Sequence, residues 1–162
     1  MEKEILFSET QRFRKIWLWA PLLATGAFFI FQDVLLLLND ARSMDREELF
    51  VSNALIILIT LLIYSIRLDT LIKTDGVYVR FFPFVPRYRK FALEELSQVQ
   101  IRQYSPIGDY GGWGLRFGFG NGKAYTISGN KGIQLVFTNG SRLLIGTQLP
   151  EAAAEALQRF GF

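Results

Sequence analysis

Two long apolar runs near the start of the chain constrain its fold more than any other feature. They cover residues 16–38 and 50–66, and each has about the 17–25 residues that a helix needs to cross a bilayer. Only the polar segment 39–48 separates them. In lipid, every backbone N–H and C=O group must be paired within its own segment. The sequence therefore predicts a transmembrane helical hairpin over residues 16–66, and the first run, which has no small-residue cleavage site, is expected to be retained.

Basic residues flank this hairpin mainly on its outer sides. Two lie in the connecting segment, whereas five precede the first run or follow the second: Arg12, Arg14, Lys15, Arg67 and Lys73. Basic residues beside membrane spans stay preferentially in the cytoplasm. We therefore expect a multi-pass protein of the cell inner membrane with both termini cytoplasmic, and residues 1–15 as a cytoplasmic N-terminal segment.

Beyond residue 67 the pattern changes to period-two alternation broken by turn signals, which is typical of antiparallel strands. Turns are predicted at residues 74–76, 121–122 and 139–140, each of which contains glycine. Pro150 then suits the first turn of a helix. We expect an α+β protein in which residues 67–162 form a barrel or sandwich of about seven antiparallel strands. The C-terminal helix is expected to cover one open end with Ala153, Leu157 and Phe160.

Composition limits the chemistry of the chain. It has neither Cys nor His, which excludes disulfides, thiol nucleophiles, Ser-His catalysis and the usual zinc sites. We expect neither an enzyme nor a cofactor. Residues 67–162 hold twelve Lys/Arg and seven Asp/Glu, a net charge of +5. A basic domain tethered to a membrane would face anionic lipid head groups.

Four stretches of the β region carry a resemblance to a known group. The stretches are residues 75–83 (DGVYVRFFP), 104–116 (YSPIGDYGGWGLR), 122–135 (GKAYTISGNKGIQL) and 144–150 (LIGTQLP). In these stretches the chain resembles bacterial membrane proteins in which a pleckstrin-homology-like domain follows two spanning helices, a family of largely unknown function. The resemblance implies a fold and a membrane setting, but no catalytic residues. An oligonucleotide-binding-type barrel is the alternative fold, and it places its helix between strands.

Two surface sites are expected in the β domain. Arg87, Arg89 and Lys90 follow the apolar segment 83–86, which is the pattern of a loop facing lipid head groups; the alternative is an edge strand protected by charge. Single-stranded nucleic acid would also use aromatic residues and cations, but the tether and the modest basicity argue against that partner. The second site is an aromatic loop with Tyr110, Trp113 and Arg116, which either meets a partner or lipid or packs its indole on the domain.

Asp33 lies within the first apolar run, where a charge is a functional-site hypothesis by default. The alternative is a structural contact with Ser52 or Asn53 on the second helix. Overall, we expect a non-enzymatic membrane module that binds lipid head groups, a protein partner or a second copy of itself. The alternative is an accessory subunit that contacts a membrane enzyme or transporter through its hairpin.

Overall fold

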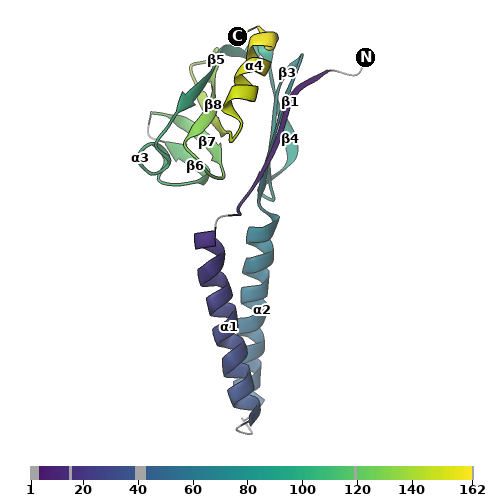
Figure 1. Cartoon of the computed structure of the whole chain (residues 1–162), viewed down its shortest axis with the longest axis vertical. Helices are drawn as coiled ribbons and strands as arrows, with labels where there is room; N and C mark the ends of the chain where they lie inside the picture. Colours follow the sequence, from purple (N-terminus) through teal and green to yellow (C-terminus); the bar gives the residue numbers. More distant parts are fainter. Residues whose placement is uncertain (1–3, 15, 39–42, 119, 162) are drawn as a thin grey trace. The chain divides into compact units, whose positions relative to one another are not determined.

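The computed structural model describes residues 4–14, 16–38, 43–118 and 120–161. The chain divides into two compact units (Figure 1). One unit is helical and consists of residues 13–65. The other combines residues 1–12 with residues 66–162 and holds all the strands of the described residues.

The helical unit is a pair of antiparallel helices, α1 (Ile16–Leu38) and α2 (Ser43–Ser65) (Figure 1). Each contains a stretch of 19 residues that is long and apolar enough to cross a membrane. The mean hydropathy is 1.5 in Leu18–Leu36 and 2.0 in Glu47–Ser65. The first helix matches the predicted span. The second begins at Ser43 rather than Phe50, because residues 43–49 contain good helix formers and neither Gly nor Pro. Residues 39–42 of the predicted turn lie outside the described residues.

Contacts near both ends join the two helices. Asn53 Nδ2 donates a hydrogen bond to Asp33 Oδ2 at 2.8 Å and another to the Leu49 carbonyl oxygen at 3.0 Å. The rings of Trp19 and Tyr64 meet edge to face, with 6.3 Å between their centroids. The Asp33 carboxyl is therefore partnered within the hairpin, as the structural alternative for this residue requires.

Sheet 1 is an antiparallel meander of four strands in the order β1-β2-β3-β4. The strands are β1 (Ile5–Arg12), β2 (Arg67–Lys73), β3 (Gly76–Phe82) and β4 (Val85–Ala92). The sequence predicts residues 1–15 as a separate segment; instead, most of it forms β1, which pairs with β2 from Ile5 to Arg12. The inner positions of β1 are Phe7, Glu9 and Gln11, all buried. Two of the three are polar, so hydrophobic periodicity did not reveal this strand.

Sheet 2 has five strands in the order β5-β8-β9-β7-β6. Only β7 and β9 are parallel, and the other neighbours are antiparallel. The one-turn helix η1 (Leu93–Glu95) connects the two sheets. The remaining elements are β5 (Leu96–Gln103), α3 (Pro106–Tyr110), β6 (Gly114–Gly118), β7 (Gly122–Thr126), β8 (Lys131–Phe137), β9 (Arg142–Gly146) and α4 (Pro150–Phe160).

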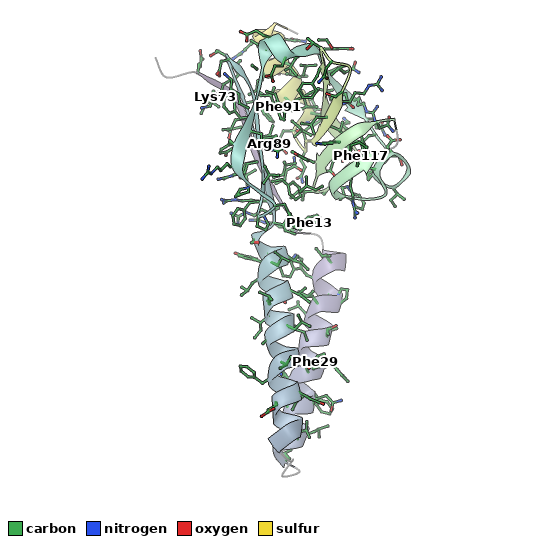
Figure 2. All side chains as sticks on the ribbon, turned by 180° about the vertical axis from the view of Figure 1, so that it is seen from behind. Phe13, Phe29, Lys73, Arg89, Phe91 and Phe117 are labelled. Atoms are coloured by element: carbon green, nitrogen blue, oxygen red, sulfur yellow. The ribbon has the colours of Figure 1, made fainter. Side chains whose placement is uncertain are left out.

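The two sheets stay separate over the described residues, so of the two expected forms, a barrel or a sandwich, the β domain is an open sandwich. Apolar side chains from the two facing surfaces fill its interior (Figure 2). Aromatic rings of the two sheets contact each other at two places. The distance between ring centroids is 6.1 Å for Phe81 and Tyr125 and 5.3 Å for Phe91 and Phe137. The fully buried core residues include Leu68, Ile72, Val77, Val79, Ile133, Leu135 and Ile145.

Helix α4 covers one side of the sandwich, as the sequence predicts. It contacts β1 and β2 of sheet 1 and β5 and β8 of sheet 2. Ala153, Ala156 and Leu157 are buried on its inner face; the side chain of Phe160 lies outside the described residues. Proline at the first position removes a backbone N–H that the first turn would leave unpaired.

A buried polar network attaches β1 to the segment between β9 and α4. The Glu9 carboxylate accepts hydrogen bonds from Thr147 Oγ1 at 2.6 Å and from the Gln148 backbone N–H at 2.8 Å. Gln11 Nε2 donates to the Gly146 carbonyl oxygen at 2.6 Å. These bonds join residues more than 130 positions apart in the sequence, so the first strand is an integral part of the β domain.

Candidate functional site

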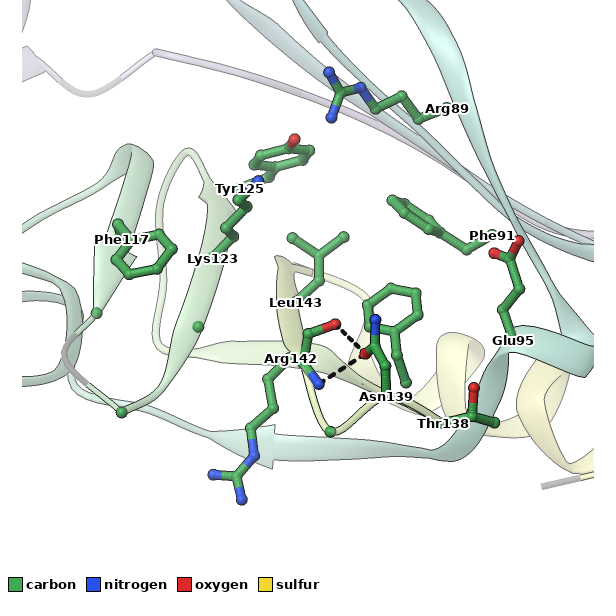
Figure 3. A pocket seen from close by; sticks show the side chains of 16 residues that line it. Arg89, Phe91, Glu95, Phe117, Lys123, Tyr125, Thr138, Asn139, Arg142 and Leu143 are labelled. Atoms are coloured by element: carbon green, nitrogen blue, oxygen red, sulfur yellow. Dashed lines mark hydrogen bonds between the residues drawn. The ribbon is translucent and has the colours of Figure 1, made fainter.

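A groove of about 810 Å³ opens between the two sheets (Figure 3). Its walls come from β4 in sheet 1 and from β6, β7, β9 and the last residue of β8 in sheet 2, whereas α4 contacts β1, β2, β5 and β8. The groove therefore occupies the part of the sandwich that the helix leaves uncovered. Its side-chain lining includes Arg89, Phe91, Glu95, Phe117, Lys123, Tyr125, Phe137, Asn139, Arg142 and Leu143.

The inner face of β4 forms the first wall. Arg89 pairs with Val79 and Phe91 pairs with Val77 across the β3–β4 ladder. Residues directly opposite each other on neighbouring strands share a face, and both valines are fully buried in the core. Arg89 and Phe91 therefore project to the interior side of sheet 1, where β4 has no helix over it.

The β6–β7 hairpin forms the second wall. Phe117 pairs with Lys123 and Leu115 pairs with Tyr125, and by period-two alternation these four side chains share one face. Tyr125 contacts Phe81 of sheet 1, so this face is the inner one. Figure 3 shows Arg89 reaching from β4 toward Tyr125, with Lys123 beside the same ring and the Arg142 side chain directed away. Phe117 is 73% exposed.

Two glycines allow this hairpin to approach its neighbours. A Cβ atom on Gly122 would lie 2.2 Å from the Arg142 carbonyl oxygen, and one on Gly118 would lie 2.5 Å from the Asp109 carbonyl oxygen. Gly122 also has φ 77°, a conformation that favours glycine. The pair Gly118–Gly122 closes the hairpin, whereas a two-residue turn at Asn121-Gly122 would place Phe117 opposite Thr126.

The three basic residues predicted as one cluster lie on two faces of β4. Arg89 faces the groove. Arg87, two residues earlier on the same strand, is exposed. Lys90 lies on the outer face, where its ammonium group forms an ion pair with Asp75 and lies 5.9 Å from the centroid of the Tyr78 ring. The strand is an edge of sheet 1 and contains Pro86, which an edge strand tolerates.

The predicted aromatic loop lies on the opposite face of sheet 2. Tyr110 is buried with Tyr104 against Ala124 and Leu144, and its hydroxyl donates to the Asn121 carbonyl oxygen at 3.3 Å. Burial raises the pKa of Tyr104 to about 12 and also raises the pKa of Tyr110. These two side chains form a small second core beneath α3 and the adjoining loop.

Trp113 and Arg116 complete this loop. The indole Nε1 donates to the Gly129 carbonyl oxygen at 2.9 Å, and Arg116 Nε donates to the Trp113 carbonyl oxygen at 3.1 Å. Trp113 is partly buried and Arg116 is exposed. The indole N–H is thus satisfied within the domain, as the packed alternative for this tryptophan requires. Asp33, the remaining predicted site residue, belongs to the helical unit.

Sequence reasoning missed Phe117, Lys123 and Arg142 as groove residues. The alternation of β6 and β7 was visible, but the two-residue turn expected at Asn121-Gly122 gave the wrong strand register. The observed register places Phe117 opposite Lys123. Which strands face β4 depends on the parallel pairing of β7 with β9, and local sequence patterns carry no signal for such a pairing.

Among the described residues, no group of three or more His, Cys, Asp or Glu side chains is placed to hold a metal ion. Comparison with known proteins adds no identification. No protein-family model matches the chain, and no curated protein or solved structure shows significant similarity to it.

Proposed function

We propose that this chain is a non-enzymatic, membrane-anchored binding module with a pleckstrin-homology-like domain at the cytoplasmic face of the inner membrane. The strand layout supports the fold assignment. Without the β6–β7 hairpin, the described strands are a four-stranded meander, β1 to β4, and a three-stranded antiparallel sheet of β5, β8 and β9. With α4 on one side, this is the arrangement of seven strands and one C-terminal helix that the resemblance implies.

The pairing of β1 with β2 supports the anchoring. β1 precedes α1 in the chain and β2 follows α2, yet the two strands are hydrogen-bonded neighbours from Arg12 opposite Arg67 onward. Both connections to the helical unit thus leave from one end of the β1–β2 ladder. If the helices cross the bilayer, the chain must return to the side on which it started, so two spans fit and one span does not.

The observation that carries the binding function is the β3–β4 turn. Phe82 pairs with Arg67, and Arg67 is two residues from Ser65, the last residue of α2. An extended chain spans at most about 3.6 Å per residue, so the second helix tethers this end of sheet 1 closely. Phe84 in the turn is 58% exposed, and the exposed Arg87 and Arg89 follow it on the edge strand.

This combination fits binding to an anionic membrane surface. Each cation near such a surface contributes about 1 kcal/mol, and an exposed aromatic residue can add apolar contact with the interface. Arg87 and Arg89 are expected to contribute more than Lys90, because Lys90 already forms an ion pair with Asp75. The ligands of the module are then lipid head groups, with a protein partner or a second copy as further occupants of the same surface.

Site-directed labelling of the full chain tests this proposal. The chain has no Cys, so Phe84→Cys and Thr74→Cys each introduce a single site for a polarity-sensitive fluorophore. Thr74 is an exposed residue at the β2–β3 turn, at the other end of β3 and roughly 20 Å along the strand. It is therefore the matched control for Phe84.

In vesicles that contain lipids brominated in their acyl chains, the label at residue 84 should be quenched and the label at residue 74 should not. Quenching at residue 84 should increase with anionic lipid and decrease with salt, because exposed charges are screened. Replacing Arg87, Arg89 and Lys90 with Gln should remove this dependence on anionic lipid. Equal quenching at residues 74 and 84, or no effect of the triple substitution, would contradict the proposal and favour an accessory subunit that acts through its helices.

A further inference from the structure

The β6–β7 hairpin is an addition to the seven-strand layout, and it builds one wall of the groove. It contributes Phe117, Lys123 and Tyr125, which face β4 across the space between the sheets (Figures 2 and 3). The volume of about 810 Å³ lies within the range of roughly 300–1,000 Å³ that is usual for small-molecule sites. The hairpin therefore creates a space large enough for a ligand.

The groove is cationic, and two of its cations have no acidic partner among the described residues. Arg67, Arg80, Lys90, Arg102 and Lys131 each form an ion pair with an Asp or Glu side chain. Arg89 and Lys123 form no such pair with any residue that the structure describes, and both are exposed. Glu95 is the acidic side chain in the lining, against the cations Arg89 and Lys123, since the Arg142 side chain points away from them. The charge of the site thus favours an anion.

The floor and rim of the groove are apolar. Tyr125 and Leu143 are each only 4% exposed, and the ring of Phe91 contacts that of Phe137 at 5.3 Å. Phe117 adds a largely exposed ring beside Lys123. In Figure 3, the Tyr125 hydroxyl lies on the same side of the groove as the charged groups of Arg89 and Lys123. A cationic group of donors thus adjoins an apolar surface.

We infer that this groove binds a single-chain anionic amphiphile, with its carboxylate or phosphate at Arg89 and Lys123 and its acyl chain against Phe91, Phe117 and Leu143. A peptide fits less well, because the side chains on the inner faces of β4 and β7 are cationic or apolar rather than neutral hydrogen-bonding groups. The Asn139 amide oxygen, which could recognise a peptide group, already accepts hydrogen bonds from the backbone N–H and the hydroxyl of Ser141 (Figure 3).

This site goes beyond the membrane contact proposed above. It uses Lys123 and Phe117 of the β6–β7 hairpin, whereas the membrane contact uses Phe84 of the β3–β4 turn. Arg89 serves both sites, so variants of Lys123 and Phe84 are the ones that distinguish the two proposals. A single-chain amphiphile exchanges through water, so it can reach the groove from a bilayer whether or not that turn touches lipid. Failure of one proposal therefore leaves the other standing.

Photolabelling of the full chain tests the inference. The chain is reconstituted in phosphatidylcholine vesicles that contain either a diazirine analogue of palmitate or the corresponding uncharged diazirine alcohol. After irradiation, labelled peptides are mapped by mass spectrometry. Labelling of α1 and α2 provides the internal standard, because both probes enter the bilayer. The palmitate analogue should label peptides containing Phe91, Phe117 or Leu143 severalfold more than the alcohol does, relative to the helices.

Arg89→Gln with Lys123→Gln should reduce this groove labelling about fivefold or more, because charge-assisted hydrogen bonds are lost. The variant Arg89→Lys with Lys123→Arg retains both charges and should keep most of the groove labelling. It controls for a loss of labelling that is caused by misfolding. Lys131→Gln, which removes a cation paired with Glu151 instead, is the matched control and should have no effect. Phe84→Ser should also leave groove labelling unchanged. Equal labelling by the two probes, or unchanged labelling in the double Gln variant, would overturn the inference.

Discussion

At the scale of single residues, the candidate aromatic site shows how a distinctive loop can be structural. Tyr104 and Tyr110 are 4% and 5% exposed, and their rings pack edge to face with 6.0 Å between centroids. Both hydroxyls donate to backbone carbonyl oxygens, at Gly129 and Asn121. Exposed side chains of this segment, such as Arg116, are therefore the ones that can contribute to a binding surface.

The first prediction concerns the titration of these tyrosines. Burial raises the pKa of Tyr104 from 10.0 to about 12, so the folded state holds this proton more tightly than the unfolded state does. The associated stability is fully present below pH 10 and is lost as the pH rises through about 12. Ultraviolet absorbance of phenolate should show a late component whose amplitude Tyr104→Phe reduces; Tyr110, whose pKa is also raised, accounts for part of the remainder. A late component of unchanged amplitude in Tyr104→Phe would contradict the burial.

The second prediction concerns the hydrogen bond between Asn53 and Asp33. Asn53→Leu leaves the Asp33 carboxyl without this donor and should destabilise the hairpin, whereas adding Asp33→Leu should recover part of the loss. A double-mutant cycle should give a coupling energy of about 0.6–1.7 kcal/mol, the range found for hydrogen bonds between membrane helices. The measurement is unfolding of the full chain in mixed micelles, with Ser52→Ala as the control. A coupling energy of zero would mean that the bond does not join the helices.

At the scale of elements, β1 determines whether the β domain is complete. Its Glu9 side chain is only 7% exposed and accepts two hydrogen bonds from the segment between β9 and α4. Glu9→Ala leaves the Thr147 hydroxyl and the Gln148 N–H without their acceptor, which should cost about 1–3 kcal/mol. Glu4→Ala, at an exposed position just before the strand, should change stability by about 0.5 kcal/mol or less.

Thermal or denaturant unfolding of the full chain measures both Glu variants, with the β domain followed by the fluorescence of Trp113 in a background in which Trp17 and Trp19 are replaced by Phe. Equal effects of Glu9→Ala and Glu4→Ala would show that β1 is not docked. If β1 is docked, a fragment of residues 67–162 lacks one strand of sheet 1. Experiments on the isolated domain should therefore join Arg12 to Arg67 by a short turn, since these residues are paired at the end of the ladder.

The elements that were predicted correctly are those with a local signal. The two apolar helices and the α4 helix after Pro150 each follow from an apolar run, a helix-start signal or a 3.6-residue period. β1 escaped detection because Glu9 and Gln11 occupy inner positions and are satisfied by long-range hydrogen bonds. The groove escaped detection because Arg89 and Lys123 come from strands in different sheets, and no local pattern places those strands face to face.

Local sequence patterns also fail to predict the contacts on the outer face of sheet 1. Thr10 and Arg80 both bind the Asp69 carboxylate, at 2.7 Å and 2.8 Å, and the Arg80 guanidinium lies over the Tyr88 ring. This row of polar contacts crosses all four strands. In the sequence, each of these residues reads as an ordinary exposed position of an alternating strand, because the partners are far apart along the chain.

At the scale of the whole molecule, the chain leaves the β domain at Arg12 and returns to it at Arg67. The intervening residues 13–65 hold two helices that are long and apolar enough to cross a membrane. Since β1 and β2 are hydrogen-bonded neighbours, a single crossing would separate strands that must stay together. The central claim is therefore a two-span anchor with the whole β domain on one side of the bilayer.

Accessibility of single cysteines in sealed vesicles tests this claim most directly. Glu4→Cys reports on the start of β1, Thr74→Cys on the β2–β3 turn and Glu47→Cys on the first turns of α2; all three positions are exposed. With a membrane-impermeant maleimide, the cysteines at residues 4 and 74 should react from the same side of the membrane and the cysteine at residue 47 only from the other. Reaction of all three from one side, or of residues 4 and 74 from opposite sides, would contradict the account.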